Sequence, residues 1–321
     1  MKLFRIFVAF AVALVIWNSC VDLESKDPDL QINLRWVKAY PTESREHVTA
    51  GLSWCLSFLG ASLPSDFQID STEWKSETLL TLDLAKAGFS QESLAAWRIL
   101  IPKLKESDEY VNHKAIDIGR FVMLTLNSAN HYNAIMVAEK RLPDFRKKYK
   151  FLKKKGAIIN SSIALENRVI EVSDAGEFGE IAFIATEGTG SIQDNSFIEK
   201  EFEIMTLMSN GQLRFALYDL NGNLKTSASP DLTNAGKTAK CLWCHEINLA
   251  SILSESPPVE NYLTDIEYNS LIADRVKMIN KYRASLADGV DFSLTQQHTK
   301  GELLYLSFME PSAIAWRWNG T

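Results

Sequence analysis

Five consecutive residues, Cys241-Leu242-Trp243-Cys244-His245, constrain the fold of this chain more than any other stretch. The 321 residues contain only four cysteines and five histidines, and three of them lie in this run. Positions i, i+3 and i+4 lie on the same face of a helix. The run therefore predicts a helix that presents two thiols and one imidazole on one side.

The C-x-x-C-H spacing is typical of covalent haem attachment. The thiols of Cys241 and Cys244 add across the two haem vinyl groups, and the imidazole of His245 coordinates the iron. A redox dithiol is the rival interpretation, but such a site opens a helix directly after a strand in a βαβ unit, and nothing in this sequence resembles that unit. The dithiol interpretation also leaves His245 unexplained.

The motif resembles the c-type cytochromes, and the resemblance covers residues 237–321. It implies one haem c on Cys241 and Cys244, with His245 as the proximal ligand, and maturation outside the cytoplasm. It does not imply the standard small cytochrome c fold, in which a long helix follows the methionine loop, because only twelve residues follow Met309. A fainter likeness is to cytochrome P-460-like proteins, which also place C-x-x-C-H after a β-rich body. Their motif lies nearer the carboxy terminus, and no cross-linking lysine is identified in this chain.

Several side chains are candidates for the distal position on the iron. Met309 precedes Glu310-Pro311, which is similar to the Met-Pro of small cytochromes c. His298 stands just before a predicted helix, where the positive end of the helix dipole keeps an imidazole neutral. A regular helix separates Met309 from His298 by about 16 Å, so both cannot reach one iron. Met278 and His131 are further candidates, and an iron without a distal protein ligand is the remaining alternative.

The amino-terminal residues predict export. Two basic residues precede an apolar run, 6–17, that is shorter than the roughly 20 residues needed to span a bilayer, so residues 1–19 are interpreted as a signal peptide. Asn18-Ser19-Cys20 resembles the lipobox of bacterial lipoproteins, although Trp17 stands where such boxes prefer leucine. We expect Cys20 to carry lipid and to anchor the protein to a membrane. Cleavage nearby without lipid, or a retained anchor, are the alternatives.

Charge and cysteine content narrow the possible partners. The net charge of −6 argues against nucleic-acid binding, because phosphate contacts need a basic surface. With lipid on Cys20 and haem on Cys241 and Cys244, only Cys55 remains, which excludes an intramolecular disulfide. Since 46% of the residues are hydrophobic, the chain can bury a sizeable core. A redox partner protein in the cell envelope is the expected partner.

The first half of the chain predicts a tether and a helical portion. Residues 20–41 are polar and acidic and contain proline, which is typical of a tether. Residues 42–155 are predicted to be helical, with apolar residues recurring around Cys55 at helical spacing. Further helical patterns cover 92–105 and 116–136. Cys55 is therefore interpreted as an ordinary buried thiol.

A basic run, 146–155, ends the helical portion. Its cations suit the negative end of a helix dipole, which favours a solvated helix end. A docking patch for an acidic redox partner or for anionic lipid is the functional alternative.

Beyond Gly156 the pattern becomes strand-like, and residues 156–236 are predicted to form an antiparallel β-rich portion. The clearest hairpin joins 202–208 to 213–218 through Asn210-Gly211, for which we expect a type I′ turn. Together with the helical haem-attachment portion over 237–321, the expected fold class is α+β.

The last portion predicts three helices. The first covers 237–254 and contains the C-x-x-C-H motif, before Pro257-Pro258. Capping boxes at Thr264-Asp265-Ile266-Glu267 and Thr299-Lys300-Gly301-Glu302 begin the other two.

Three functions follow from these observations. The first is electron transfer by an exported, lipid-anchored monohaem protein, and it is the one that we favour. The second is a haem enzyme or a sensor of small gases or peroxide, with an open distal position. The third is an envelope binding protein in which the haem is structural and residues 42–236 bind the partner.

Overall fold

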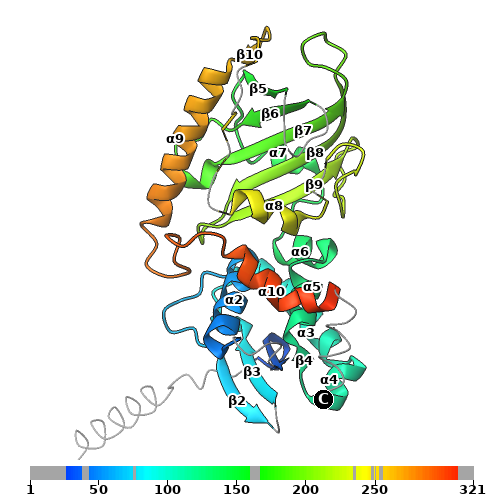
Figure 1. The fold of residues 1–321 in the computed structure, drawn as a ribbon, viewed down its shortest axis with the longest axis vertical. Coiled ribbons are helices and arrows are strands. Elements are labelled where there is room, and N and C mark those ends of the chain that lie inside the picture. The colour runs from blue at the N-terminus through cyan, green and yellow to red at the C-terminus, as the bar shows by residue number, and fades with distance from the viewer. Residues whose placement is uncertain are drawn as a thin grey trace, which may run out of the picture.

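The computed structural model describes residues 27–37, 43–74, 77–159, 167–233, 236–246, 249, 251–252 and 256–309. They form two lobes stacked along the long axis, each built on its own sheet (Figure 1). The fold is α+β with two mixed sheets, and it differs from the small cytochrome c fold. The predicted fold class is confirmed, although several strands lie where none was expected.

The lower lobe contains a four-stranded sheet, and its strands at 70–74, 77–83 and 116–117 lie within the portion that was predicted to be helical. Its order is β2-β3-β1-β4, with β1 antiparallel to β3 and parallel to β4. Ile32 and Leu34 alternate along β1 and are buried, so part of the tether expected over 20–41 is a central core strand. The elements are the 3-10 turn η1 (Pro28–Leu30), β1 (Gln31–Trp36), β2 (Asp70–Trp74), β3 (Glu77–Asp83) and β4 (Ile116–Asp117).

Helices pack around this lower sheet. The apolar stripe around Cys55 is buried on the first of them, as predicted. Trp97 is fully buried on the next long helix and stacks on Phe121, with ring centroids 5.9 Å apart. The helices are α2 (Arg45–Phe58), α3 (Gln91–Lys105), α4 (Asp108–His113), α5 (Ile118–Thr125), α6 (Ala129–Ile135) and α10 (His298–Met309), with the 3-10 turn η2 (Leu84–Lys86).

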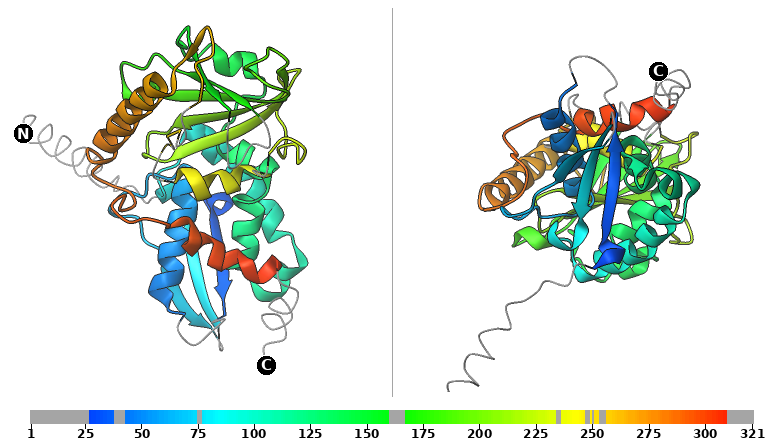
Figure 2. Two further views of the ribbon diagram at one scale, coloured as in Figure 1. Left: turned by 45° about the horizontal axis from the view of Figure 1, so that its top comes forward. Right: turned by 90° about the horizontal axis from the view of Figure 1, so that it is seen from below.

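The last described helix, α10, returns to the lower lobe and crosses α2 at small residues (Figure 2). A Cβ added at Gly51 would lie 2.8 Å from the Lys300 carbonyl oxygen, and one at Gly301 would lie 2.6 Å from Cys55 Sγ. Burial raises the pKa of the Cys55 thiol to about 12. Cys55 is thus the ordinary buried thiol that the sequence predicted, and it packs at this crossing.

The upper lobe is built on a six-stranded sheet of order β10-β5-β6-β7-β8-β9. All neighbouring strands are antiparallel except β10 and β5, which are parallel, so the predicted antiparallel middle portion is confirmed. The elements are β5 (Lys155–Ile158), β6 (Arg168–Val172), η3 (Phe178–Glu180), β7 (Ala182–Thr189), β8 (Ile198–Leu207), β9 (Leu213–Asp219) and β10 (Tyr262–Leu263).

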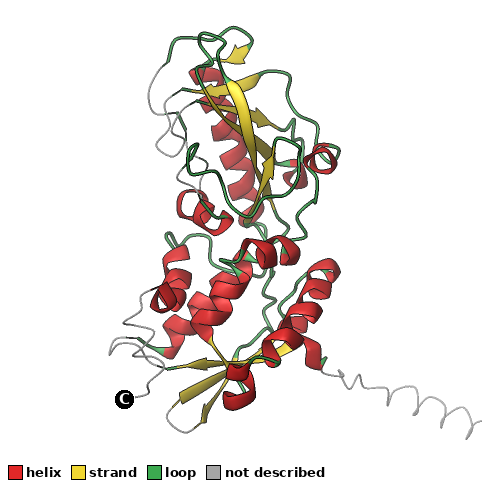
Figure 3. Ribbon diagram, turned by 90° about the vertical axis from the view of Figure 1, so that its right-hand side faces the viewer, coloured by secondary structure: helices red, strands yellow, loops and turns green. Residues whose placement is uncertain are grey.

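Helices cover both faces of the upper sheet (Figure 3). α7 (Leu142–Arg146) packs on one face, where Phe145 joins a cluster of buried strand residues. α8 (Thr238–His245) and α9 (Asp265–Arg283) pack on the other face. α9 begins with the predicted capping box, because Thr264 and Glu267 each accept a hydrogen bond from the backbone of the other.

The hairpin between β8 and β9 turns at Asn210-Gly211, as predicted, but through a different turn. The Gly211 N–H donates to the Met208 carbonyl at 3.0 Å, and Gly211 has a positive φ of 81° whereas Asn210 does not. The turn is therefore type I followed by a left-handed glycine, and the type I′ prediction is wrong. The Asn210 side-chain amide donates to the carbonyls of Ser57 and Ala61, at 2.8 and 2.9 Å, which ties the turn to the lower lobe.

The basic run at 146–155 begins at Arg146, the last residue of α7. Six of its seven cations lie within 4.0 Å of a carboxylate, so this run forms ion pairs instead of a uniformly basic patch. Arg146 and Lys155 lie beside Glu171, Lys147 beside Asp144, Lys148 beside Glu139, Lys150 beside Asp174 and Lys154 beside Glu267.

Candidate functional site

The C-x-x-C-H motif occupies α8, at the junction between the two lobes (Figure 2). Cys241, Cys244 and His245 lie in one continuous helix, as their spacing predicted. The helix is shorter than the expected span of 237–254 and ends at His245, where the Glu246 N–H donates to the Leu242 carbonyl. The imidazole therefore stands on the final residue of the helix.

The three side chains of the motif differ in their exposure. Cys241 is half-buried and packs against the main hydrophobic cluster, which extends through both lobes, whereas Cys244 is exposed. Burial raises the pKa of the Cys241 thiol well above its usual value, and the negative charge of Glu203 raises it further. The half-buried His245 ring lies beside Phe215 of β9, with centroids 6.2 Å apart. The motif thus runs from the protein core to the surface.

These residues suit a large group bound at its edge better than a bare metal ion. Cys241 and Cys244 form no disulfide, so both thiols are available for attachment. Within the described ranges, no three His, Cys, Asp or Glu side chains converge to hold a metal ion. Two thiols along one helix face with an imidazole beside them match the two vinyl carbons and the iron of a haem. The donor set therefore fits the haem that the sequence predicts.

Glu246, which the sequence analysis did not single out, connects the motif to α10. Its carboxylate accepts hydrogen bonds from the backbone of Gln297 and His298 and from the Nδ1 of His298. Arg283 Nη2 donates to the Glu246 carbonyl at 3.0 Å. An acidic residue directly after the motif was the available signal, but its partners lie about fifty positions further along the chain.

The start of α10 therefore differs from the prediction. A capping box at Thr299-Lys300-Gly301-Glu302 was expected, whereas the helix begins at His298. The backbone N–H groups of Gln297 and His298 donate to the Glu246 carboxylate. This carboxylate, which is distant in sequence, caps the amino-terminal end of α10. The capping-box prediction is wrong because a tertiary contact takes its place.

The structure separates the distal-ligand candidates. His298 is held by Glu246, and Met309 ends the same helix about 16 Å away at about 1.5 Å per residue, although its side chain lies outside the described part. His131 Nδ1 lies 2.6 Å from the Leu124 carbonyl. Met278 Sδ accepts a hydrogen bond from a nearby arginine at 3.4 Å. Each candidate whose side chain is described has a hydrogen bond within the protein, and none is assigned to the iron.

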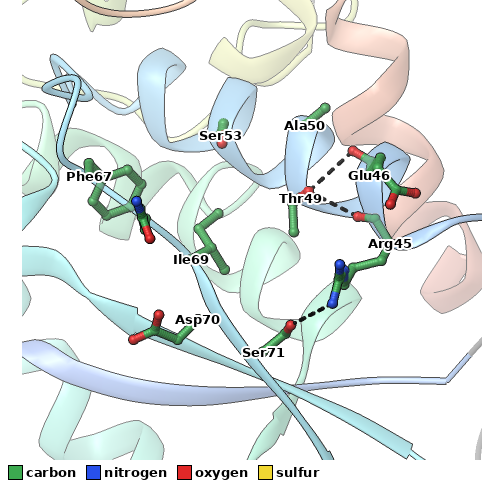
Figure 4. Close-up of a pocket in the computed structure, with 10 residues that line it drawn as sticks. Arg45, Glu46, Thr49, Ala50, Ser53, Phe67, Ile69, Asp70 and Ser71 are labelled. Atoms are coloured by element: carbon green, nitrogen blue, oxygen red, sulfur yellow. Dashed lines mark hydrogen bonds between the residues drawn. The ribbon is translucent and has the colours of Figure 1, made fainter.

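Two surface pockets lie away from the motif. One, of about 630 Å³, lies between the first turns of α2 and the start of β2 (Figure 4). There Arg45 Nη1 donates to Ser71 Oγ at 3.1 Å, and Thr49 Oγ1 donates to the Arg45 carbonyl at 2.9 Å. The other, of about 460 Å³, lies beside Phe178 and Tyr282. Neither pocket is lined by residues of α8, so neither is part of the candidate haem site.

Residues 1–26, which hold the predicted signal peptide and Cys20, lie outside the described part of the chain. No helix among the described residues is long and apolar enough to cross a membrane. Comparisons with protein-family models, with curated proteins and with solved structures find no match to this chain.

Proposed function

We propose that this chain is an exported c-type haem protein that transfers electrons at the cell envelope. One haem c would be attached to Cys241 and Cys244 and coordinated by His245. The observation that carries the proposal is α8, a single helix that presents two thiols outside any disulfide and one imidazole at matching spacing. A haem bound there supplies a one-electron iron couple.

The surroundings of α8 support this role. Half-buried Cys241 would tie an attached group to the main hydrophobic cluster, and Phe215 packs beside the His245 ring. Glu246 and Arg283 hold the carboxyl end of α8, so the imidazole stands on an anchored backbone. The exposed Cys244 would leave one edge of an attached group near solvent, where a redox partner protein could approach.

The envelope location in this proposal rests on the sequence. A signal peptide over 1–19 and lipid on Cys20 would hold the protein at a membrane beside its redox partner. Replacing Cys20→Ala should move the protein from the membrane fraction to the soluble fraction. An unchanged distribution, with no lipid on the Cys20 peptide by mass spectrometry, would contradict the anchor.

Haem staining on a denaturing gel tests covalent attachment. The wild-type chain should stain, and Cys241→Ser and Cys244→Ser should each lose most of the stain. Cys55→Ser is the matched control, because Cys55 is a buried thiol on another helix and should not affect staining. A wild-type chain without stain after export by a strain that attaches haem to other proteins would overturn the proposal.

Absorption spectra distinguish electron transfer from the second candidate, a haem enzyme or gas sensor. That alternative is favoured by the hydrogen bonds that engage His131, Met278 and His298 within the protein, since a distal position without a protein ligand binds external molecules. A six-coordinate low-spin spectrum that ignores carbon monoxide and cyanide supports electron transfer. A high-spin spectrum that shifts with these ligands supports the alternative.

A further inference from the structure

A cluster of charged side chains lies inside the upper lobe, on the face of the sheet that α8 and α9 cover. In the register of the sheet, Arg168 of β6 lies opposite Glu187 of β7, and Glu187 lies opposite Glu201 of β8. Glu203 lies two residues further along β8, so its side chain is on the same face. Glu201 and Glu187 are 0% and 1% exposed. Cross-strand register therefore gathers three carboxylates and one guanidinium in the interior.

The cluster has fewer cations than carboxylates. Arg168 Nη2 lies 2.7 Å from Glu187 Oε1 and 4.0 Å from Glu203 Oε2. Glu201 has separate partners: it forms an ion pair with Lys225 and accepts hydrogen bonds from the backbone N–H and the hydroxyl of Ser229. Glu203 Oε1 accepts no hydrogen bond from any described residue. Among the described residues, Arg168 is the one cation within 4.0 Å of Glu187 and Glu203, and the more distant charge of Lys225 also acts on Glu203. Two buried carboxylates with so little compensating charge favour the protonated form of one of them.

The other elements packed against the cluster add few charged or titratable groups. Tyr268 approaches Arg168 from α9, and the Cys241 thiol approaches Arg168 and Glu203 from α8. Asp219 pairs with Glu201 in the register of β8 and β9 and accepts hydrogen bonds from Asn223. None of these three groups is a cation, and Lys225 is paired with Glu201. The Glu187–Glu203 pair therefore still has fewer cations than carboxylates around it.

The cluster adjoins the motif through the next strand. In the register of β8 and β9, Glu203 lies opposite Leu217, and Phe215 stands two residues away on the same face. Phe215 is the residue beside the His245 ring. The carboxylates and the motif therefore share one face of the sheet, separated by the width of about one strand pair.

We propose that Glu187 and Glu203 form a proton-binding pair whose protonation is linked to reduction of the group attached at Cys241. The inference rests on the proposed haem function. In this step one electron arrives from the redox partner protein, and one proton from solvent forms an O–H bond with a carboxylate of the pair. No other bond forms or breaks. Loss of one positive charge from the attached group favours the added proton, and the proton in turn favours reduction.

Burial supports this proton-binding role. It raises the pKa of Glu187 to about 8, with the charges of Glu203 and Glu201 acting in the same direction and Arg168 opposing them. Burial also raises the pKa of Glu203, again against Arg168. With a pKa of about 8, Glu187 exchanges its proton in a pH range where reduction of an attached group would change its protonation.

Redox titration of the haem-loaded chain between pH 5 and 9 tests the linkage. In part of this range the equilibrium constant for reduction should fall about tenfold per pH unit, which is about 59 mV for a one-electron couple. Glu187→Gln should flatten this dependence, and Glu203→Gln provides a second variant at a less buried position. Glu199→Gln is the matched control, because it is exposed on the same strand and should leave the slope unchanged. A wild-type potential that is independent of pH overturns the linkage.

Infrared spectroscopy tests the proton site without haem. The full chain produced without attached haem should show a protonated carboxyl band at neutral pH that disappears in Glu187→Gln or Glu203→Gln. Absence of that band overturns the proton-binding pair. If the chain fails to stain for haem, the proposed function fails, and the infrared band still decides whether the pair binds a proton.

Discussion

Each lobe contains a buried glutamate, Glu109 on α4 and Glu187 on β7, and the two glutamates have different surroundings. Glu109 of the lower lobe is 6% exposed and lies 3.5 Å from Arg35 and 3.2 Å from Arg120. It also accepts a hydrogen bond from the Asp117 N–H at 2.9 Å. Glu187 of the upper lobe is more deeply buried, yet it shares one guanidinium with Glu203.

The difference shows that donors, and not burial alone, determine what a buried carboxylate does. Two guanidinium groups and an N–H contact the Glu109 carboxylate, which thereby joins α4 to β1, β4 and α5 in the lower lobe. A single shared guanidinium leaves Glu187 able to take up a proton. The lower cluster is therefore structural, and the upper cluster is suited to titrate.

The largest effect is expected at Glu109. Glu109→Ala leaves Arg35 and Arg120 near an empty position, and we expect a loss of about 3–5 kcal/mol in the free energy of unfolding. Urea denaturation measures this loss, with Glu106→Ala as an exposed control. A loss below about 1 kcal/mol would show that the lower cluster is no more structural than the upper one.

The pH dependence of stability sharpens the comparison at Glu187. Its folded pKa of about 8 lies above the ordinary 4.5, so between these values the folded chain holds a proton that the unfolded chain lacks. The contribution of Glu187 to stability should therefore be fully present below this window and be lost as pH rises through it, by at most about 1.4 kcal/mol per pH unit. Glu187→Gln should remove this fall in urea denaturation at several pH values. Parallel profiles for the two proteins would contradict the raised pKa.

Asn210 of the upper lobe is hydrogen-bonded to the lower lobe, so its replacement tests how much the contact between the two lobes contributes to stability. Asn210→Ala removes hydrogen bonds to the carbonyls of Ser57 and Ala61, and we expect a loss of about 1–3 kcal/mol. Asn210→Asp should lose more at neutral pH than at pH 4, because a carboxylate would then face two carbonyl oxygens. Thermal unfolding measures both variants, and equal stability of Asp and Ala at neutral pH would contradict these contacts.

A smaller effect is expected at Thr264, the N-cap of α9. Thr264→Ala removes the capping box with Glu267, and we expect a loss of about 1 kcal/mol. Because α9 covers the face that holds the Glu187 cluster, the variant also tests whether local loosening changes that cluster. The carboxyl infrared band should stay unchanged. A lost band would mean that the cluster depends on the ordering of α9 more than on its own register.

Local patterns predicted many elements. The apolar stripe around Cys55 predicted α2, the pattern over 92–105 predicted α3, and the predicted strand 213–218 lies within β9. The capping box at Thr264 predicted the start of α9. In each case the signal lies within one turn or one strand, so neighbouring residues are sufficient to define it.

The missed elements depend on distant partners. Ile32, Leu34 and Trp36 alternate as a strand does, but the acidic residues before them favoured a tether, and the partner strand β3 begins some forty positions later. The start of α10 was misplaced because Glu246, far away in sequence, binds its first amides. Strand pairing and capping from a distance are tertiary contacts, which a local pattern does not contain.

By itself, the sequence determined that two thiols and an imidazole lie on one face of a helix, because that spacing needs only helical geometry. It also determined the fold class, through the change from helical to strand-like patterns. Tertiary structure alone decided what the motif faces. The register between β6, β7, β8 and β9 placed Arg168, Glu187 and Glu203 on the face that α8 covers. Burial between the packed layers raises the pKa values of the two glutamates, which makes them candidates for binding a proton.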